Sequence, residues 1–404
     1  MELTPYDELP VHQSPYPFSY VPVSDYSWDD GYWFGVFSPD DGVYLSTGMR
    51  INPNTDMVGG YALFIDHGRQ FTLRFNRSWR RDYALRVGPY SVEVLEPLKR
   101  LRLRLDENDM GLSFDVEWQG ACPAYLEPHH FATNRGRPTT DQSRYSQPGT
   151  AEGVIEFRGK RFDVRPGQWS AARDHSWGLY AERPPLAPDS ALLPPPVREG
   201  PGRAMRLWCQ FRTDRYSGFL VHHETAEGKP VASGDVFSGL FNGRIYEGWK
   251  GTAAVMAGLE REFAYRGDSR VLDSVDLDVT DTEGAPWRMR YDIAALPWVP
   301  YTLGYTAGSW KDGGTFNTFH GSEELAIEWD ELDATEQPFH YTPYGFEPGE
   351  AKDDMGLGMD PEKPINGIEY MARFVMTDPE GTEHPGAAHV EHMVRGRYEP
   401  YGFE

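Results

Sequence analysis

Leu101-Arg102-Leu103-Arg104-Leu105 alternates strictly between an apolar and a cationic side chain. After a polar break at 106–111, the run Leu112-Ser113-Phe114-Asp115-Val116-Glu117-Trp118 has the same two-residue period. Successive side chains of a strand point to opposite faces of its sheet, so this period is typical of strands with one buried and one solvated face. Together with 90–95, the two runs predict a three-stranded antiparallel meander.

The same pattern recurs along the chain. Hairpins are expected where two strand-like runs flank a short turn, at 154–157 with 161–164, at 275–279 with 287–293, and at 370–376 with 389–397. The 42 glycines and 33 prolines are spread between such runs as turn residues, which favours an all-β chain. Helical patterns are scarce, and the best helix candidate is 253–264.

The length of 404 residues is large for one hydrophobic core and favours two domains. The densest proline cluster, around 184–196, cannot be a central strand and indicates a linker between two β-rich halves. We therefore predict an N-terminal domain over 1–185, a proline-rich linker over 186–203 and a C-terminal domain over 204–404. A second stretch, 337–364, is rich in Pro, Gly and acidic residues and is expected to form a long irregular loop.

Charge and composition exclude several classes of partner. A net charge of -23 argues against binding to nucleic acid or to an anionic membrane, because both favour a basic surface. No apolar run approaches the ~20 residues that cross a bilayer, and the N-terminus lacks the features of a signal peptide. Cys122 and Cys209 lie far apart, so we expect a cytoplasmic protein with two reduced thiols. The sequence does not indicate an oligomeric state.

The segment 169–178 follows a Pro166-Gly167 turn and carries the candidate chemistry. If it is a strand, its odd-numbered residues, among them His175 and Trp177, share one face and its even-numbered residues share the other. Asp174 then has only small neighbours on its own face, which leaves room for a ligand or for a closely packed strand. Asp174 and His175 point apart and form no dyad unless a bulge reorients one of them.

A carboxyl group buried among apolar and aromatic side chains has a raised pKa, because desolvation penalises the charged form. Asp174 in that state would protonate a carbon–carbon double bond or an enol. The resulting cation needs an electron-rich wall, which aromatic faces provide. The tryptophans considered for that wall are Trp28, Trp33, Trp169, Trp177 and Trp208. The alternative is that Asp174 pairs with an arginine or caps the end of a neighbouring strand.

Three histidine-containing stretches were weighed as metal sites: 127–130 (Glu-Pro-His-His), 222–224 (His-His-Glu) and 389–392 (His-Val-Glu-His). On strands, His222 and Glu224 would share a face, and so would His389 and Glu391, with His392 turned away. A metal site needs three or four converging donors. No HExxH motif or cysteine-rich spacing is present, so we expect no metal and no other cofactor. A P-loop, a GxGxxG turn and a GxSxG elbow are also missing, which excludes the common nucleotide-binding and α/β-hydrolase classes.

The stretch Arg173-Asp174-His175-Ser176-Trp177-Gly178 resembles the Asp-His-x-Trp-Gly signature of the AttH / hydroxyneurosporene synthase (carotenoid 1,2-hydratase) family. Ser27-Trp28 and 127–130 also resemble its uncharacterised bacterial branch. The resemblance implies two lipocalin-like (calycin) antiparallel β-barrels packed side by side, with a hydrophobic ligand in or between them. Characterised relatives hydrate, cyclise or rearrange polyenes and terpenoids without a metal or organic cofactor.

By this resemblance the acid role falls on Asp174. We take Asp174 and His175 as candidate catalytic residues, and His130 with the five tryptophans as candidate substrate-binding residues. The first hypothesis is a cofactor-free hydratase, isomerase or cyclase that acts on a hydrophobic terpenoid- or polyene-like molecule. The second is a non-catalytic carrier of a hydrophobic ligand. The third is a carbohydrate-active β-protein, which requires two facing carboxyl groups.

Overall fold

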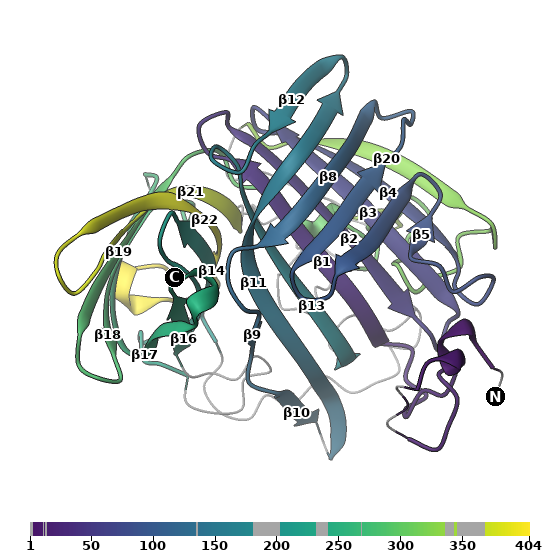
Figure 1. Ribbon diagram of the computed structural model, residues 1–404, viewed down its shortest axis with the longest axis horizontal. Coiled ribbons are helices and arrows are strands. Elements are labelled where there is room, and N and C mark those ends of the chain that lie inside the picture. Colours follow the sequence, from purple (N-terminus) through teal and green to yellow (C-terminus); the bar gives the residue numbers. More distant parts are fainter. Residues whose placement is uncertain are drawn as a thin grey trace.

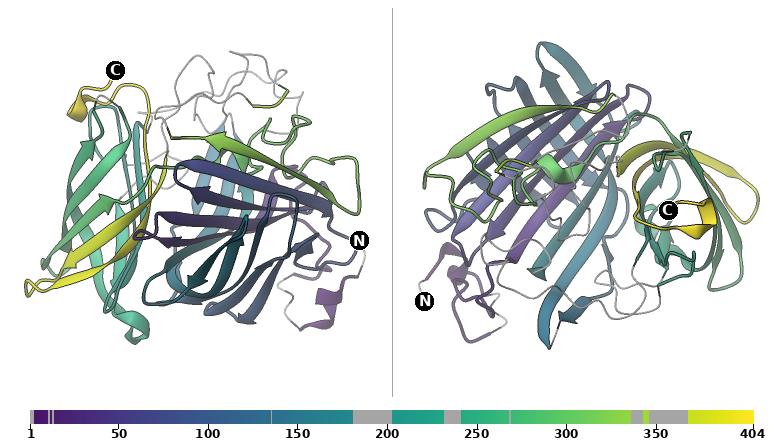
Figure 2. Two further views of the ribbon diagram at one scale, coloured as in Figure 1. Left: turned by 90° about the horizontal axis from the view of Figure 1, so that it is seen from above. Right: turned by 180° about the vertical axis from the view of Figure 1, so that it is seen from behind.

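The computed structural model describes residues 3–10, 12, 14–134, 136–180, 203–231, 241–267, 269–335, 343–345 and 368–404. Almost all regular elements are strands, and they form one open sheet and one closed barrel that lie side by side (Figures 1 and 2). This architecture confirms the all-β prediction. The predicted linker lies outside the described residues except for Arg203, and so does the predicted loop 337–364 except for 343–345.

The larger body is a fourteen-stranded sheet built mainly from the first half of the chain. Its strands are β1 (Trp28–Ser38), β2 (Val43–Asn52), β3 (Met57–Asp66), β4 (Arg69–Ser78), β5 (Arg86–Val87), β6 (Tyr90–Glu96), β7 (Arg100–Leu105), β8 (Leu112–Gly120), β9 (Tyr125–Leu126), β10 (His130–Asn134), β11 (Arg137–Phe157), β12 (Lys160–Val164), β13 (Ser170–Tyr180) and β20 (Ala326–Asp333). They follow the order β20-β4-β3-β2-β1-β13-β11-β8-β7-β6-β5, with β9, β10 and β12 paired to β11. The antiparallel pairing of β6 with β7 and of β7 with β8 confirms the predicted three-stranded meander.

The alternating runs lie as expected on this sheet. Leu101, Leu103 and Leu105 of β7 are buried in the core, whereas the arginines between them are exposed or half-buried. Arg102 forms an ion pair with Asp115, its diagonal neighbour on β8. The sheet curves around this core, which also holds Trp118, and we call the side that faces the core the inner face.

The smaller body is a closed antiparallel barrel. Its strands in order are β14 (Met205–Thr213), β15 (Ser217–Glu224), β16 (Asn242–Tyr246), β17 (Thr252–Tyr265), β18 (Leu272–Asp281), β19 (Pro286–Ile293), β21 (Glu369–Thr377) and β22 (Glu383–Val394). Short 3-10 turns occur at η1 (Pro5–Glu8), η3 (Gly248–Lys250), η4 (Pro300–Thr302) and η5 (Glu399–Tyr401). None of the described helices is long and apolar enough to cross a membrane.

The helix predicted at 253–264 is wrong, because this segment is strand β17. Its alanines, leucine and charged residues favour a helix only weakly, and tertiary pairing overrides that preference. In the barrel, β17 pairs with β16 on one side and with β18 on the other, and Ala254, Met256 and Phe263 are buried in the core.

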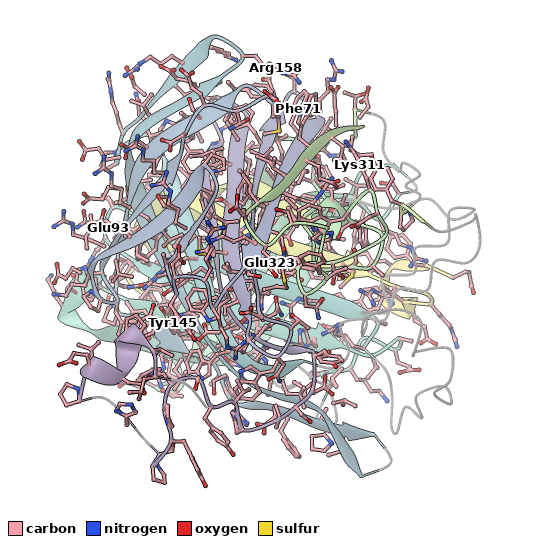
Figure 3. The ribbon with its side chains drawn as sticks, turned by 90° about the vertical axis from the view of Figure 1, so that its right-hand side faces the viewer. Phe71, Glu93, Tyr145, Arg158, Lys311 and Glu323 are labelled. Atoms are coloured by element: carbon pink, nitrogen blue, oxygen red, sulfur yellow. The ribbon has the colours of Figure 1, made fainter. Side chains whose placement is uncertain are left out.

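Strand β20 comes from the second half of the chain but joins the first sheet, where it pairs with β4 at the sheet edge (Figure 2). Arg74 of β4 donates to Glu328 and Asp330 of β20, at 2.7 Å each. The guanidinium of Arg158 lies over the ring of Phe71, 4.5 Å from its centroid, at one end of this edge (Figure 3). The region predicted as the second domain therefore supplies a strand to the first sheet.

Strands β1, β2, β11 and β13 are covered on both faces. Their outer face, which we call the seam face, lies against barrel strands β14 and β22 and against the segment 294–317. Gln210 of β14 joins the two bodies, because its side-chain amide donates to the carbonyl oxygen of Arg173 at 2.9 Å. Phe37, Trp298 and Met371 form part of the apolar packing between them. Polar side chains on the seam face are therefore enclosed between the sheet and the barrel.

Candidate functional site

Strand β13 shows the predicted alternation. Ala172 packs in the seam and Ala171 in the core of the sheet, and the pairing of β13 with β1 runs without a bulge. Asp174 therefore lies on the seam face, between Trp33 of β1 and Ser146 of β11. His175 lies on the inner face, so the two adjacent residues form no dyad.

Asp174 forms an ion pair with an arginine, as the alternative interpretation had it. Its Oδ2 lies 3.6 Å from Nε of Arg144, and both side chains are largely buried. An adjacent guanidinium favours the charged form of a carboxyl group. The environment of Asp174 is therefore that of a carboxylate.

His175 and three of the candidate tryptophans lie on the opposite side of the sheet from Asp174. The Nε2 atom of His175 is 2.7 Å from Oδ1 of Asp30, and its Nδ1 is 3.1 Å from the hydroxyl of Tyr145. Trp177 lies beside this histidine and is 37% exposed. Trp169 is buried in the core of the sheet, and Trp28 lies on the inner face by its position in β1.

The other predicted residues meet in the seam. His389 of β22 packs against two indoles that also contact each other, with its ring centroid 4.7 Å from that of Trp33 and 5.5 Å from that of Trp208. The indole N–H of Trp33 donates to Ser46 at 3.1 Å. His130 is buried on β10, where its Nε2 lies 3.6 Å from a carboxylate oxygen of Glu127. The seam thus combines closely packed aromatic rings with buried polar groups.

The sequence prediction missed Glu369, which has the most perturbed carboxyl group of the seam. Its Oε2 atom is buried, although 12% of the side chain is exposed, and it lies 3.2 Å from Nε2 of His389. The two atoms are not aligned for a hydrogen bond, and within the described residues Oε2 has no hydrogen-bond partner. Burial raises the pKa of Glu369 well above its ordinary value, and the charges of Glu391 and Asp174 raise it further. This carboxyl group is therefore held neutral.

Two groups near Glu369, the imidazole of His389 and the phenol of Tyr44, are uncharged as well. Burial lowers the pKa of His389 to about 3, so its imidazole carries no charge near pH 7. Its Nδ1 lies 2.8 Å from the hydroxyl of Tyr44, whose pKa burial raises well above the ordinary value. A side chain at position 35 would overlap that hydroxyl, so Gly35 gives Tyr44 the space to reach the histidine.

Glu391 lies directly across the ladder from Glu369 and has the opposite charge state. Two nitrogens of Arg206 hold its carboxylate, at 2.5 and 3.0 Å. Burial alone would raise the pKa of Glu391, but the charge and hydrogen bonds of Arg206 lower it to about 2. A negative charge therefore lies next to Glu369 and adds to the effect of burial, which is the main cause of its raised pKa.

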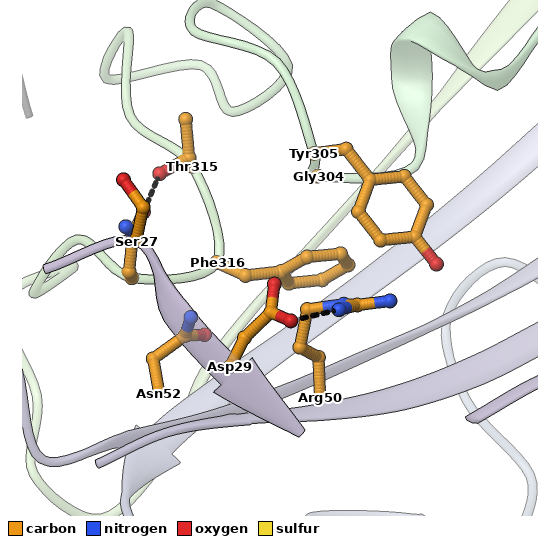
Figure 4. Close-up of a pocket in the computed structure, with 9 residues that line it drawn as sticks. Ser27, Asp29, Arg50, Asn52, Gly304, Tyr305, Thr315 and Phe316 are labelled. Atoms are coloured by element: carbon orange, nitrogen blue, oxygen red, sulfur yellow. Dashed lines mark hydrogen bonds and ion pairs between the residues drawn. The ribbon is translucent and has the colours of Figure 1, made fainter. Parts of the chain in front are cut away.

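One end of the seam opens into a pocket (Figure 4). It is a small, half-open hollow of about 20 Å³, and it is lined by Ser27, Asp29, Arg50, Asn52, Gly304, Tyr305, Thr315, Phe316 and Asn317. Arg50 forms an ion pair with Asp29 at 2.6 Å, and its guanidinium lies 5.1 Å from the centre of the Tyr305 ring. The pocket joins a buried ion pair to an aromatic wall.

The other histidine stretch of the barrel lies inside it. His222 and Glu224 share the interior face as predicted, 2.7 Å apart. Arg261 and Tyr398 also bind the carboxylate of Glu224. In the part of the chain that the structure describes, no three His, Cys, Asp or Glu side chains converge as a metal site requires.

Comparisons with known proteins give one family match. A family model described as a family of unknown function, DUF8625, matches residues 3–341. A search of curated proteins gives no match.

Solved structures give weak likenesses over almost the whole chain. Kievitone hydratase from Nectria haematococca is 10% identical, with a TM-score of 0.42 over 97% of this chain and 96% of that one. CghA with Sch210972 is 9% identical, with a TM-score of 0.42 over 91% of this chain and 88% of that one. CghA itself is 8% identical, with a TM-score of 0.42 over 95% of each chain. These likenesses carry no statement about activity, and the resemblance to the carotenoid hydratase group stays a prediction.

Proposed function

Because this chain belongs to DUF8625, a family of unknown function, we propose its activity from its own geometry. The protein is a cofactor-free hydratase, isomerase or cyclase that transfers a proton to a hydrophobic small molecule in the seam between sheet and barrel. The observation that carries the proposal is the neutral carboxyl group of Glu369, whose buried Oε2 has no hydrogen-bond partner among the described residues. The environment of Glu369 favours its neutral form, whereas the arginine next to Asp174 favours the charged form. Two carboxyl groups whose environments have opposite effects can act as general acid and general base.

Glu369 is the proton donor in this proposal. Its O–H bond breaks and a C–H bond forms at one carbon of a double bond, which leaves a carbocation and a carboxylate. The rings of Trp33 and Trp208 lie beside His389 and stabilise positive charge nearby through their π electrons. The enclosed seam limits the access of stray water to the cation.

Asp174 is the proton acceptor. Its ion pair with Arg144 suits a carboxylate that takes a proton, either from the water that adds to the cation or from a neighbouring carbon. The first route is a hydration, and the second is an isomerisation or the last step of a cyclisation. Exchange with solvent returns the proton from Asp174 and reprotonates Glu369. The role of Asp174 in proton transfer, predicted from the sequence, is thus kept, but with the direction reversed.

Deuterium uptake from heavy water tests the proposal for all three reaction types, because each of them forms a C–H bond with a proton from solvent. A panel of polyenes and terpenoid alcohols is incubated with the protein in deuterated buffer, and deuterium bound to carbon is measured by mass spectrometry. Glu369→Gln and Asp174→Asn should each lower the rate by about 10²–10⁴-fold, which is the usual contribution of a general acid or base.

The control is His175→Gln, because His175 lies on the other face of the same strand. It should label the substrate at the wild-type rate. A folded Glu369→Gln variant that labels at that rate would remove the proposed donor. Retention of a panel molecule without any label would favour the carrier hypothesis instead.

A further inference from the structure

We propose that the seam face also holds a polar recess that binds a neutral oxygen function, a hydroxyl or a carbonyl group, of the hydrophobic molecule. This inference rests on the proposed function for the site, but not on the identity of the proton donor. It assigns the molecule to a narrower class, an apolar skeleton with an uncharged oxygen at one end.

Buried polar atoms without partners mark the recess. Gln142 of β11 is 1% exposed, and among the described residues neither its amide oxygen nor its amide nitrogen has a hydrogen-bond partner. Ser176 of β13 is fully buried, and its hydroxyl has none either. Each buried polar group without a partner costs about 1–3 kcal/mol, so several in one place call for a ligand or bound water.

These side chains share one face and are close neighbours. In one row across the sheet, Gly178 lies between Asp29 and Gln142. In the next row, Ser176 lies between Gly31 of β1 and Arg144 of β11. Rows on one face are ~7 Å apart and neighbouring strands ~4.8 Å, so the backbones of Gln142 and Ser176, on adjacent strands and in adjacent rows, lie roughly 8 Å apart.

Two glycines on this face allow the neighbouring backbones to approach closely. Gly178 has φ +127 and would meet the backbone of β11 if it carried a Cβ, so its backbone requires glycine. Gly31 likewise lies against the backbone of β2. Within these rows of the described sheet, β13 therefore places no side chain between Asp29 and Gln142, and β1 places none between Arg50 and Ser176.

The solvent-facing pocket at Arg50 lies over the same face of the sheet as the recess. This residue is 5% exposed, lines the pocket, and has no hydrogen-bond partner for its Nε atom within the described chain (Figure 4). It lies in the same row as Ser176, on the far side of Gly31. The rings of Tyr305 and Phe316, 5.3 Å apart, form an apolar wall beside it. An entering molecule thus meets aromatic rings first and polar donors next.

The charge balance selects an uncharged ligand group. Arg50 is paired with Asp29 at 2.6 Å, and Arg144 with Asp174 at 3.6 Å. Two guanidinium groups and two carboxylates leave no net positive charge for a carboxylate or phosphate. A hydroxyl or carbonyl oxygen instead finds donors in the amide of Gln142 and in the guanidinium groups, without repulsion from the aspartates.

Two glutamines of equal burial provide the first test. Gln70 of β4 is also 1% exposed, but its amide donates to the carbonyl oxygen of Val299 and to Thr302 and accepts from the N–H of Val299. Methionine has a similar shape without the polar atoms. Gln70→Met should lower the melting temperature, whereas Gln142→Met should leave it unchanged or raise it by about 2 °C, the shift that ~1 kcal/mol gives in a large domain.

An equal drop in melting temperature for both variants would overturn the inference, because the amide of Gln142 would then be held internally. The second test uses three probes of one shape, 2-naphthol, naphthalene and 2-naphthoate, with binding measured by ligand-observed NMR. The wild-type protein should bind 2-naphthol about tenfold more tightly than the other two, the effect of one or two hydrogen bonds. Gln142→Met and Ser176→Ala should each remove most of that preference.

Tighter binding of 2-naphthoate, equal binding of all three probes, or no binding of 2-naphthol would each refute a site for neutral oxygen. Glu369→Gln separates this inference from the proposed function. It should abolish proton transfer while leaving the preference for 2-naphthol intact. A wild-type rate in Glu369→Gln together with an intact preference would refute the proton donor and support the recess.

Discussion

The neutral carboxyl group of Glu369 predicts a pH dependence of stability that one amide substitution removes. In the folded protein, burial raises its pKa well above the ordinary value of 4.5. Above pH 4.5 the unfolded chain releases this proton, whereas the folded protein keeps it until the pH reaches the raised pKa. The folded state then binds more protons than the unfolded state, so the free energy of unfolding falls as the pH rises. Below pH 4.5 both states carry the proton and the full stability is present.

One unbalanced proton changes the free energy of unfolding by about 1.4 kcal/mol per pH unit. Between pH 5 and pH 7 the wild-type protein should therefore lose up to about 2.8 kcal/mol that Glu369→Gln retains. His389 acts in the opposite direction, because its pKa is lowered to about 3 and only the unfolded state takes up its proton near pH 6. It is present in both proteins, so its effect cancels in the difference.

The assay is urea unfolding followed by tryptophan fluorescence at pH 5, 6 and 7. Glu93→Gln, at an exposed position of β6, is the control and should follow the wild-type protein at every pH. The stability difference between Glu369→Gln and wild type should grow steadily in favour of the variant. A difference that stays constant from pH 5 to pH 7 would refute the neutral state of Glu369.

Two further predictions concern other buried groups. Arg206→Met leaves the carboxylate of Glu391 in the seam without its two hydrogen bonds from this arginine. The substitution should destabilise the protein by about 3 kcal/mol, which is the low end for a broken buried ion pair, because Glu391 is 20% exposed. Equal urea midpoints for the variant and the wild type would contradict this prediction. Cys122 and Cys209 are buried, and burial raises the pKa of both thiols, so neither should react with Ellman's reagent in the native protein and both should react in guanidinium chloride. Rapid reaction of the native protein would show that solvent reaches these positions.

Period-two patterning was sufficient for the strands and for the direction of many side chains. The faces of 169–178 followed from alternation alone, as did the separation of His392 from His389 on β22, where His389 faces the seam and His392 the barrel interior. Strand β17 was not predicted as a strand, because its composition weakly favours a helix. Only pairing with its neighbours in the barrel makes it a strand.

The acid of the site was not predictable in the same way. Glu369 is a single carboxyl group in the apolar stretch 368–372, and that interruption was the only local signal. Its neutral state depends on Glu391, on the opposing strand, and on Asp174, from the other body of the molecule. Asp174 in turn owes its ion pair to Arg144 of β11. Such partners are chosen by the fold and cannot be read from spacing along the chain.

The return of β20 to the edge of the first sheet has a consequence during synthesis. Until this strand leaves the ribosome, β4 presents a free row of backbone donors and acceptors, which is a template for pairing with other chains. Six of the eight barrel strands, β14 to β19, are translated in that interval. A nascent chain of this protein therefore depends on rapid elongation or on a chaperone until its last edge strand is delivered.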